Sequence, residues 1–158
     1  MSPRKYPLQA LAQARGYGVD AATRSLAEAV RVREGAAETR QVAQARKDDH
    51  ERGTRVVKAA ERASLEKGDL RASDLARADA WAVRAAVERD ALAAGLEQAR
   101  AAEAKASDAL SGAQRRVAER RAEAGVVDKH RARWDAARRA TVEAAEEEAS
   151  GEAWRPKG

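Results

Sequence analysis

Apolar residues recur at helical spacing along most of this 158-residue chain. Steps of alternately three and four residues, from Leu75 to Glu148, visit 22 positions, and 15 of these are apolar. We call this row of positions the seam, since a heptad repeat kept over such a distance is typical of a coiled coil. Proline, which breaks helix interiors, is absent between Pro7 and Pro156. The pattern therefore predicts a chain that is almost entirely helical.

One interruption divides the pattern at Gly68, a residue that suits the position just past a helix end. Pro7 suits the start of the first helix, because its fixed φ is already helical. The predicted fold is one all-α domain, a long two-helix antiparallel coiled-coil hairpin. Its predicted parts are a first helix at about 7–67, a turn at about 68–73, a second helix at about 74–150 and a frayed tail at 151–158.

Local signals refine these helix ends. Asp69 or Ser73 is predicted to cap the second helix, with Asp74 adding negative charge to its first turn. Gly16 and Gly18 weaken the first helix early, so a frayed or bent segment with a restart at Asp20 is expected.

The first helix has a less regular apolar pattern than the second. Its apolar positions lie in two groups, which are Leu8, Leu11, Val19, Ala22, Leu26, Ala29 and Val30, and then Val56, Val57, Ala60 and Leu65.

Antiparallel pairing about the turn places residues opposite each other when their numbers sum to about 139. Leu8 then lies near Arg131, and everything after Arg131, including Trp134, extends beyond the first helix or contacts something else. A monomeric hairpin is favoured, and a dimer of extended helices is the alternative.

Composition supports a thin core. The chain has 42 alanines, no Phe or Ile, and 36% charged residues, which fits the long-helix class better than an ordinary globule. Disorder is the main competitor, but Pro is rare and Ala and Arg are good helix formers. Cysteine is absent, and no apolar run is long enough to span a membrane, so a cytoplasmic protein is expected.

Charge is unevenly placed in the second helix, although the net charge is only +5. A basic stretch is followed by acidic residues. The basic residues are Arg115, Arg116, Arg120, Arg121, Lys129, Arg131, Arg133, Arg138 and Arg139, and the acidic ones are Glu143, Glu146, Glu147, Glu148 and Glu152. Nucleic-acid binding is a minor alternative, because acidic residues interrupt the basic stretch at helical spacing.

Grouped reactive residues are not visible in the sequence. His50 and His130 stand alone on charged faces and are expected to be solvated. No metal, cofactor or catalytic motif is recognisable, so an enzyme is the least expected class.

Two tryptophans are better candidates for contacts. Trp134 lies on the seam and Trp81 lies one position off it, and either could pack on the seam or contact a partner.

Three segments resemble the stalk proteins of type III secretion systems. They are the opening 6–11, the turn region 68–75 followed by Ala80 and Trp81, and the ending, with 130–134, 146–148 and 152–154. The family comprises the YscO/SctO proteins of injectisomes and their flagellar counterpart FliJ. The acidic ending with Trp154 favours the injectisome branch, and with it a role in virulence.

The resemblance implies a non-enzymatic coupling protein, peripheral to a membrane-embedded secretion apparatus. Implied partners are the hexameric secretion ATPase, the cytoplasmic domain of the export gate and secretion chaperones. The implied ATPase contacts are Leu8, Leu11, Arg15, Arg131, Trp134 and Arg138. The implied gate or chaperone contacts beside the turn are Leu75, Trp81, Ala85 and Glu88. A generic coiled-coil scaffold protein is the alternative function.

Overall fold

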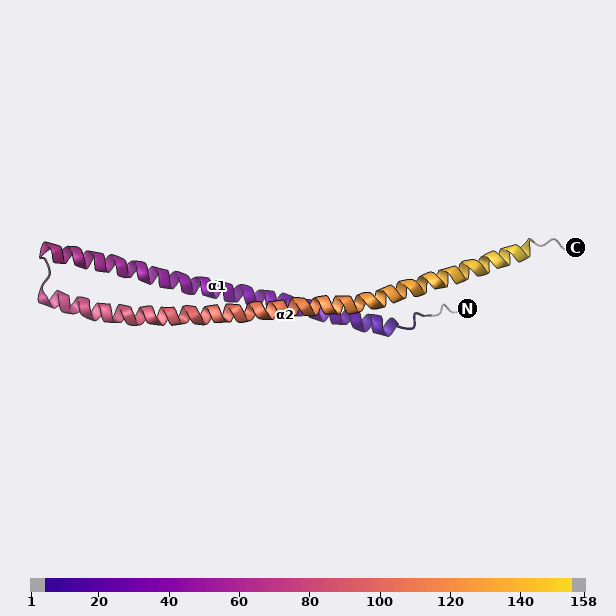
Figure 1. Cartoon of the computed structure of the whole chain (residues 1–158), viewed down its shortest axis with the longest axis horizontal. Coiled ribbons are helices and arrows are strands. Elements are labelled where there is room, and N and C mark those ends of the chain that lie inside the picture. Colours follow the sequence, from indigo (N-terminus) through magenta and orange to yellow (C-terminus); the bar gives the residue numbers. More distant parts are fainter. Residues whose placement is uncertain (1–4, 155–158) are drawn as a thin grey trace. The chain divides into compact units, whose positions relative to one another are not determined.

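The computed structural model describes residues 5–154 and consists of two helices joined by a short turn (Figure 1). Helix α1 spans Gln9–Lys67 and helix α2 spans Ala72–Ala153. The two helices pack against each other, and the residues described contain no strand. The predicted all-α helical hairpin is confirmed.

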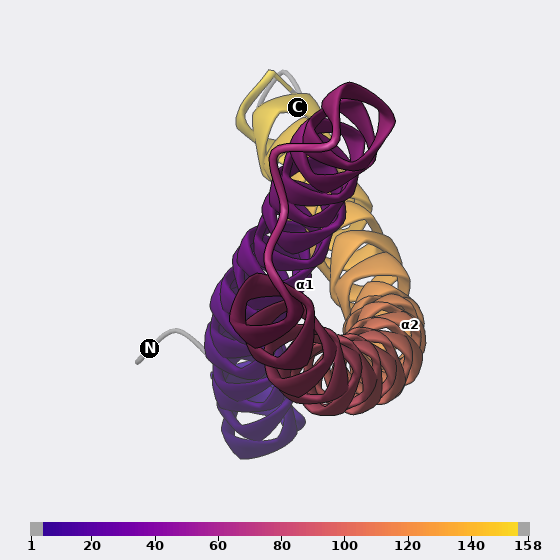
Figure 2. The ribbon, with the colours of Figure 1, turned by 90° about the vertical axis from the view of Figure 1, so that its left-hand side faces the viewer.

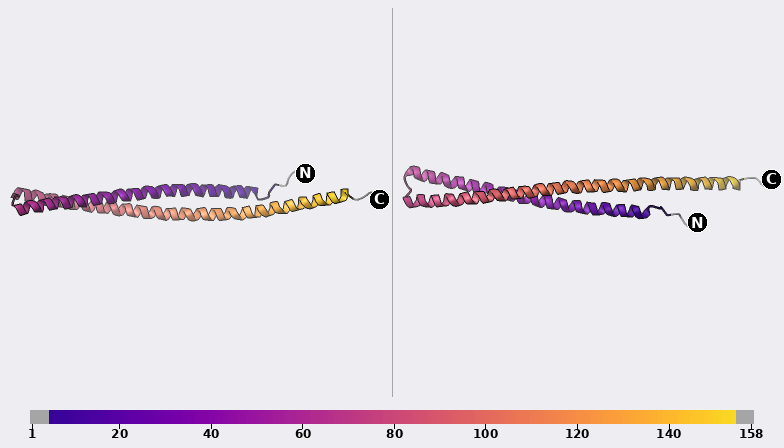
Figure 3. Two further views of the ribbon diagram at one scale, coloured as in Figure 1. Left: turned by 90° about the horizontal axis from the view of Figure 1, so that it is seen from above. Right: turned by 60° about the horizontal axis from the view of Figure 1, so that its bottom comes forward.

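The hairpin comprises two compact units, each built from both helices. The terminal unit takes its described residues from 5–27 and 112–154, and the turn unit consists of residues 28–111. Within each unit the two helices lie side by side, as two further views show (Figure 3).

Gly68 ends α1 with φ of 74°, in the left-handed region that glycine adopts without a steric penalty. Its N–H donates to the Leu65 carbonyl at 3.1 Å, and the Asp69 N–H donates to the Ser64 carbonyl at 3.1 Å. This pair of bonds is a Schellman motif, which satisfies two carbonyls at the helix end. The predicted end of the first helix at Lys67 is confirmed, and the connecting segment is visible in Figure 2.

The start of α2 differs from the prediction. The residue at the N-cap position, directly before the first helical residue, is Arg71. It is neither Asp69 nor Ser73, the two predicted caps. The Asp74 carboxylate accepts a hydrogen bond from the Arg71 N–H at 3.1 Å, which satisfies a donor that the helix leaves free. Asp74 therefore does more than add charge to the first turn, because its side chain closes that turn.

Other helix limits also differ from the prediction. Pro7 lies in a turn, and α1 begins at Gln9, whose N–H donates to the Tyr6 carbonyl at 3.2 Å. The fraying at Gly16 and Gly18 with a restart at Asp20 does not occur, since α1 is continuous from Gln9 to Lys67. The helix α2 runs to Ala153, so residues 151–153 of the expected frayed tail are helical, and 155–158 lie outside the described residues.

The core is the seam on α2. The seven buried residues of this helix all belong to the seam, and they are Ala85, Leu96, Ala99, Ala106, Ala113, Val117 and Val127. No residue of α1 is fully buried, and Val56, Val57 and Leu65 are exposed although they belong to the apolar pattern of this helix. In α1, the residues that face α2 include the half-buried Arg40 and Thr54 instead. The two helices therefore contribute unequally to the core.

One polar position of the seam, Glu103, has ion-pair partners across the hairpin. Glu103 lies 2.6 Å from Arg40 Nε and 3.9 Å from Arg33, and its side chain is 19% exposed. The Arg40 N–H does not point well at the carboxylate, so the contact is an ion pair rather than a directed hydrogen bond. A partly buried carboxylate in an alanine seam needs this cationic compensation.

The predicted register is confirmed in both units. In the terminal unit Arg15 pairs with Glu123, and in the turn unit His50 lies 3.6 Å from Glu88. Each pair sums to 138, against the expected value of about 139. The antiparallel register thus follows from the position of the turn.

Two glycine substitutions should have opposite effects on stability. Gly68→Ala should lower the free energy of unfolding by about 1–2 kcal/mol, because alanine pays a steric penalty at positive φ. Gly53→Ala should raise it by about 0.5–1 kcal/mol, since its added Cβ meets no atom within 4 Å and alanine favours helix. Urea denaturation followed by circular dichroism measures both values. Equal changes in the two variants would contradict the assigned turn.

Candidate functional site

Tyr6 is the centre of an aromatic cluster in the terminal unit. This residue precedes α1 and is only 6% exposed. Its ring lies 5.6 Å from the Trp134 ring in an edge-on arrangement and 5.7 Å from the His130 ring. Aromatic pairs in such geometry add about 0.5–1.5 kcal/mol beyond the area they bury. We call Tyr6, His130 and Trp134 the terminal clasp, since they join the segment before α1 to α2.

The clasp also contains hydrogen bonds. The Tyr6 hydroxyl lies 2.8 Å from His130 Nδ1 and donates to the Val127 carbonyl at 3.4 Å. A hydroxyl has one proton to donate, so both bonds are made when His130 Nδ1 carries a proton and donates it to the hydroxyl oxygen. His130 is exposed, but it is not the isolated histidine that was expected.

Arginines cover the clasp. The Arg131 guanidinium lies 5.8 Å from the centre of the Tyr6 ring, and that of Arg138 lies 5.6 Å from the centre of the Trp134 ring. Cation–π contacts at exposed sites contribute about 0.5–1 kcal/mol each. Arg120 donates to Glu123 at 3.2 Å, and Glu123 also pairs with Arg15. Part of the basic stretch is therefore occupied within the hairpin, which weakens the case for a nucleic-acid surface.

The structure brings three of the six predicted ATPase-contact residues together. Arg131, Trp134 and Arg138 border one groove together with Tyr6. Leu8 and Leu11, which belong to the apolar pattern predicted for the first helix, are 36% and 40% exposed. Trp134 was expected either to extend beyond the first helix or to contact something else, and it contacts Tyr6, which precedes α1.

Sequence reasoning missed Tyr6 as a packing residue. The antiparallel register could have found it, since a sum near 139 places residue 6 opposite residue 133, between His130 and Trp134.

The predicted contacts beside the turn lie in the turn unit and do not form one group. Trp81, Ala85 and Glu88 border a groove against α1, whereas Leu75 is not among the residues that line it. Ala85 is 8% exposed, so its side chain is covered by α1 and is not available to a partner. Trp81 is half-buried beside Gly53 and Val57 of α1, which matches the alternative that it packs on the seam.

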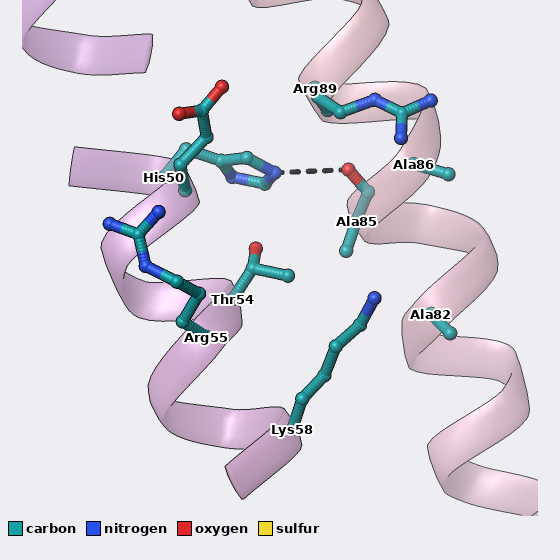
Figure 4. A pocket seen from close by; sticks show the side chains of 9 residues that line it. His50, Thr54, Arg55, Lys58, Ala82, Ala85, Ala86 and Arg89 are labelled. Carbon is teal, nitrogen blue, oxygen red and sulfur yellow. Dashed lines mark hydrogen bonds between the residues drawn. The ribbon is translucent and has the colours of Figure 1, made fainter. Parts of the chain in front are cut away.

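His50 is a second correction to the expected solvated histidines. Its side chain is 14% exposed, and Nε2 lies 3.0 Å from the Ala85 carbonyl (Figure 4). A carbonyl only accepts, so Nε2 carries the proton in this bond. The imidazole thus joins the two helices where the small Ala85 side chain leaves room for it.

A groove of about 220 Å³ adjoins His50 in the turn unit (Figure 4). Its cationic residues are Arg55 and Lys58 of α1 and Arg89 of α2, and Arg89 donates to Asp90 at 2.8 Å. Figure 4 shows Lys58 extending between the helices, while Arg55 runs along its own helix. The cationic groups do not converge on one point, so the groove has no defined binding geometry.

Within residues 5–154 no group of three or more His, Cys, Asp or Glu side chains could hold a metal ion. No helix among these residues is both long and apolar enough to cross a membrane.

Comparisons of the chain with protein-family models, curated proteins and solved structures found no match.

Substitutions of Tyr6 should loosen the terminal unit. Tyr6→Phe should lower local stability by about 1 kcal/mol through loss of the hydroxyl bonds. Tyr6→Ala should lower it by about 3 kcal/mol, as truncation of buried aromatic residues does. Amide hydrogen exchange at residues 9–15 and 127–134 measures the effect. Tyr17→Phe, at an exposed position, is the matched control. Unchanged exchange in Tyr6→Ala would exclude a stabilising role for the clasp.

Proposed function

We propose that this chain is a non-enzymatic coupling component of a type III secretion system. The terminal unit would contact the hexameric export ATPase, and residues of the turn unit would contact the export gate or secretion chaperones. In this proposal the protein is cytoplasmic and peripheral to the secretion apparatus. The proposal rests on the resemblance of the opening, turn and ending segments, and the helical hairpin is compatible with it.

The observation that supports the ATPase contact best is the exposure of two leucines beside the clasp. Leu8 directly precedes α1 and Leu11 lies in its first turn, and the clasp holds the segment that precedes them. Exposed leucines on a rigid backbone suit a protein partner, because little ordering entropy is lost when they bind. Arg131 and Arg138, which lie over the Tyr6 and Trp134 rings of the clasp, offer charge to an acidic partner surface.

For the gate contact, the remaining candidates are Leu75, Trp81 and Glu88. Leu75 is 40% exposed and the Glu88 side chain is 67% exposed, so both are accessible. Ala85 is left out because it is covered. A generic coiled-coil scaffold remains the second candidate function, and it is favoured by the exposed final turns of α2.

Addition of this protein should raise the hydrolysis rate of the purified export ATPase from the same source. Leu11→Arg should weaken the apparent affinity of this effect at least about tenfold, as the loss of a central interface residue does. Val32→Arg, at an exposed position in the turn unit, is the matched control. If the unaltered protein neither binds the ATPase nor stimulates it, the ATPase assignment is wrong and the scaffold function is favoured.

Trp81→Ala tests the gate assignment separately. We expect binding to the purified gate domain to weaken by about 2 kcal/mol or more, because tryptophan dominates many interfaces. Helicity should persist, since Trp81 is only half-buried. Val87→Ala, at an exposed position nearby on the same helix, controls for general effects of truncation. Normal gate binding and normal secretion in Trp81→Ala would remove this assignment.

A further inference from the structure

The last turns of α2 are exposed to solvent, as every residue from Arg139 to Glu152 shows. A groove on this part of the helix is lined by residues of α2 alone, among them Ala132, Arg139, Val142 and Glu146. Val142 is 49% exposed at the centre of these positions. We call residues 139–152 the free segment.

The free segment separates its positive and negative charges. Arg139 precedes Val142, and carboxylates follow it, at Glu143, Glu146, Glu147, Glu148 and Glu152. Along the groove, Arg139 lies three residues before Val142 and Glu146 lies four residues after it. If two copies of this segment were placed antiparallel about Val142, Arg139 of each would face the acidic block of the other.

The acidic block is poorly compensated by the residues that the structure describes. None of its five carboxylates has an ion-pair partner among residues 5–154. Glu152 lies in the last turn of α2, which contains no basic residue. Negative charge is unfavourable there, since the helix dipole places partial negative charge at the C-terminus. Cations supplied by another molecule would relieve this repulsion.

We infer that the free segment pairs with the free segment of a second copy of this chain, antiparallel about a twofold axis near Val142. Such an interface is isologous, so Arg139 of each copy meets Glu146 of the other and the favourable pair occurs twice. Val142 and the neighbouring alanines supply the apolar contact between the helices. The dimer is reversible and weakened by salt, because the apolar surface is small and the ion pairs are exposed. This inference is independent of the proposed function and differs from the sequence-based expectation of a monomer.

Charge reversal tests the pairing directly. Sedimentation equilibrium of the full chain at low salt should show a monomer–dimer equilibrium. Arg139→Glu alone and Glu146→Arg alone should each weaken the dimer at least about tenfold, because each places like charges opposite each other twice. An equimolar mixture of the two variants should restore the dimer, since both pairs across a mixed dimer again have opposite charge.

Matched controls reverse charge elsewhere on α2. Arg121→Glu and Glu119→Arg change the net charge equally at exposed positions outside the free segment, and both should dimerise like the unaltered chain. A monomer at every concentration overturns the inference. So does a dimer that is insensitive to both reversals, a mixture that stays monomeric, or an assembly larger than a dimer.

Discussion

The seam of small side chains on α2 is the constraint on which the rest of the hairpin depends. Ala99, Ala106 and Ala113 are buried there at intervals of seven residues. Alanine loses no side-chain entropy on burial, but it also removes little apolar area from water, so each layer contributes a small free energy. Stability must therefore accumulate over many layers, which explains why both helices are far longer than the average of globular proteins.

A seam this uniform specifies register weakly, because one alanine layer resembles the next. Polar and aromatic contacts across the hairpin supply the missing specificity. Glu103 is held by Arg40 in the turn unit, and the His50 imidazole reaches the Ala85 carbonyl. In the terminal unit Arg15 pairs with Glu123 and Tyr6 packs on Trp134. Each contact is satisfied only when the helices pair in one register, as single polar residues do in other coiled coils.

The thin core also determines where partners could act. Much of each helix faces solvent, so recognition depends on side chains that rise above the alanine surface. Leu8 and Leu11 do so beside the terminal clasp, and the charged blocks of the free segment do so on α2. The leucines offer apolar area and the free segment offers charge order, which are different requirements on a partner. The hairpin can thus present two chemically distinct contact surfaces, one at the start of α1 and one on α2.

The helical fold, the end of α1 at Gly68, the register and the buried positions of α2 were determined by the sequence itself. The helices and the buried positions follow from local propensities and from a repeat kept over many turns, and the approximate register follows from the position of the turn, which contacts across the hairpin then fix. The tertiary structure decided what depends on reach across the hairpin. Tyr6 meets Trp134, and His50 enters the space over Ala85, because the opposing backbones come close at those places. It also left Val56 and Val57 exposed, since the partner helix covers only one narrow face of α1.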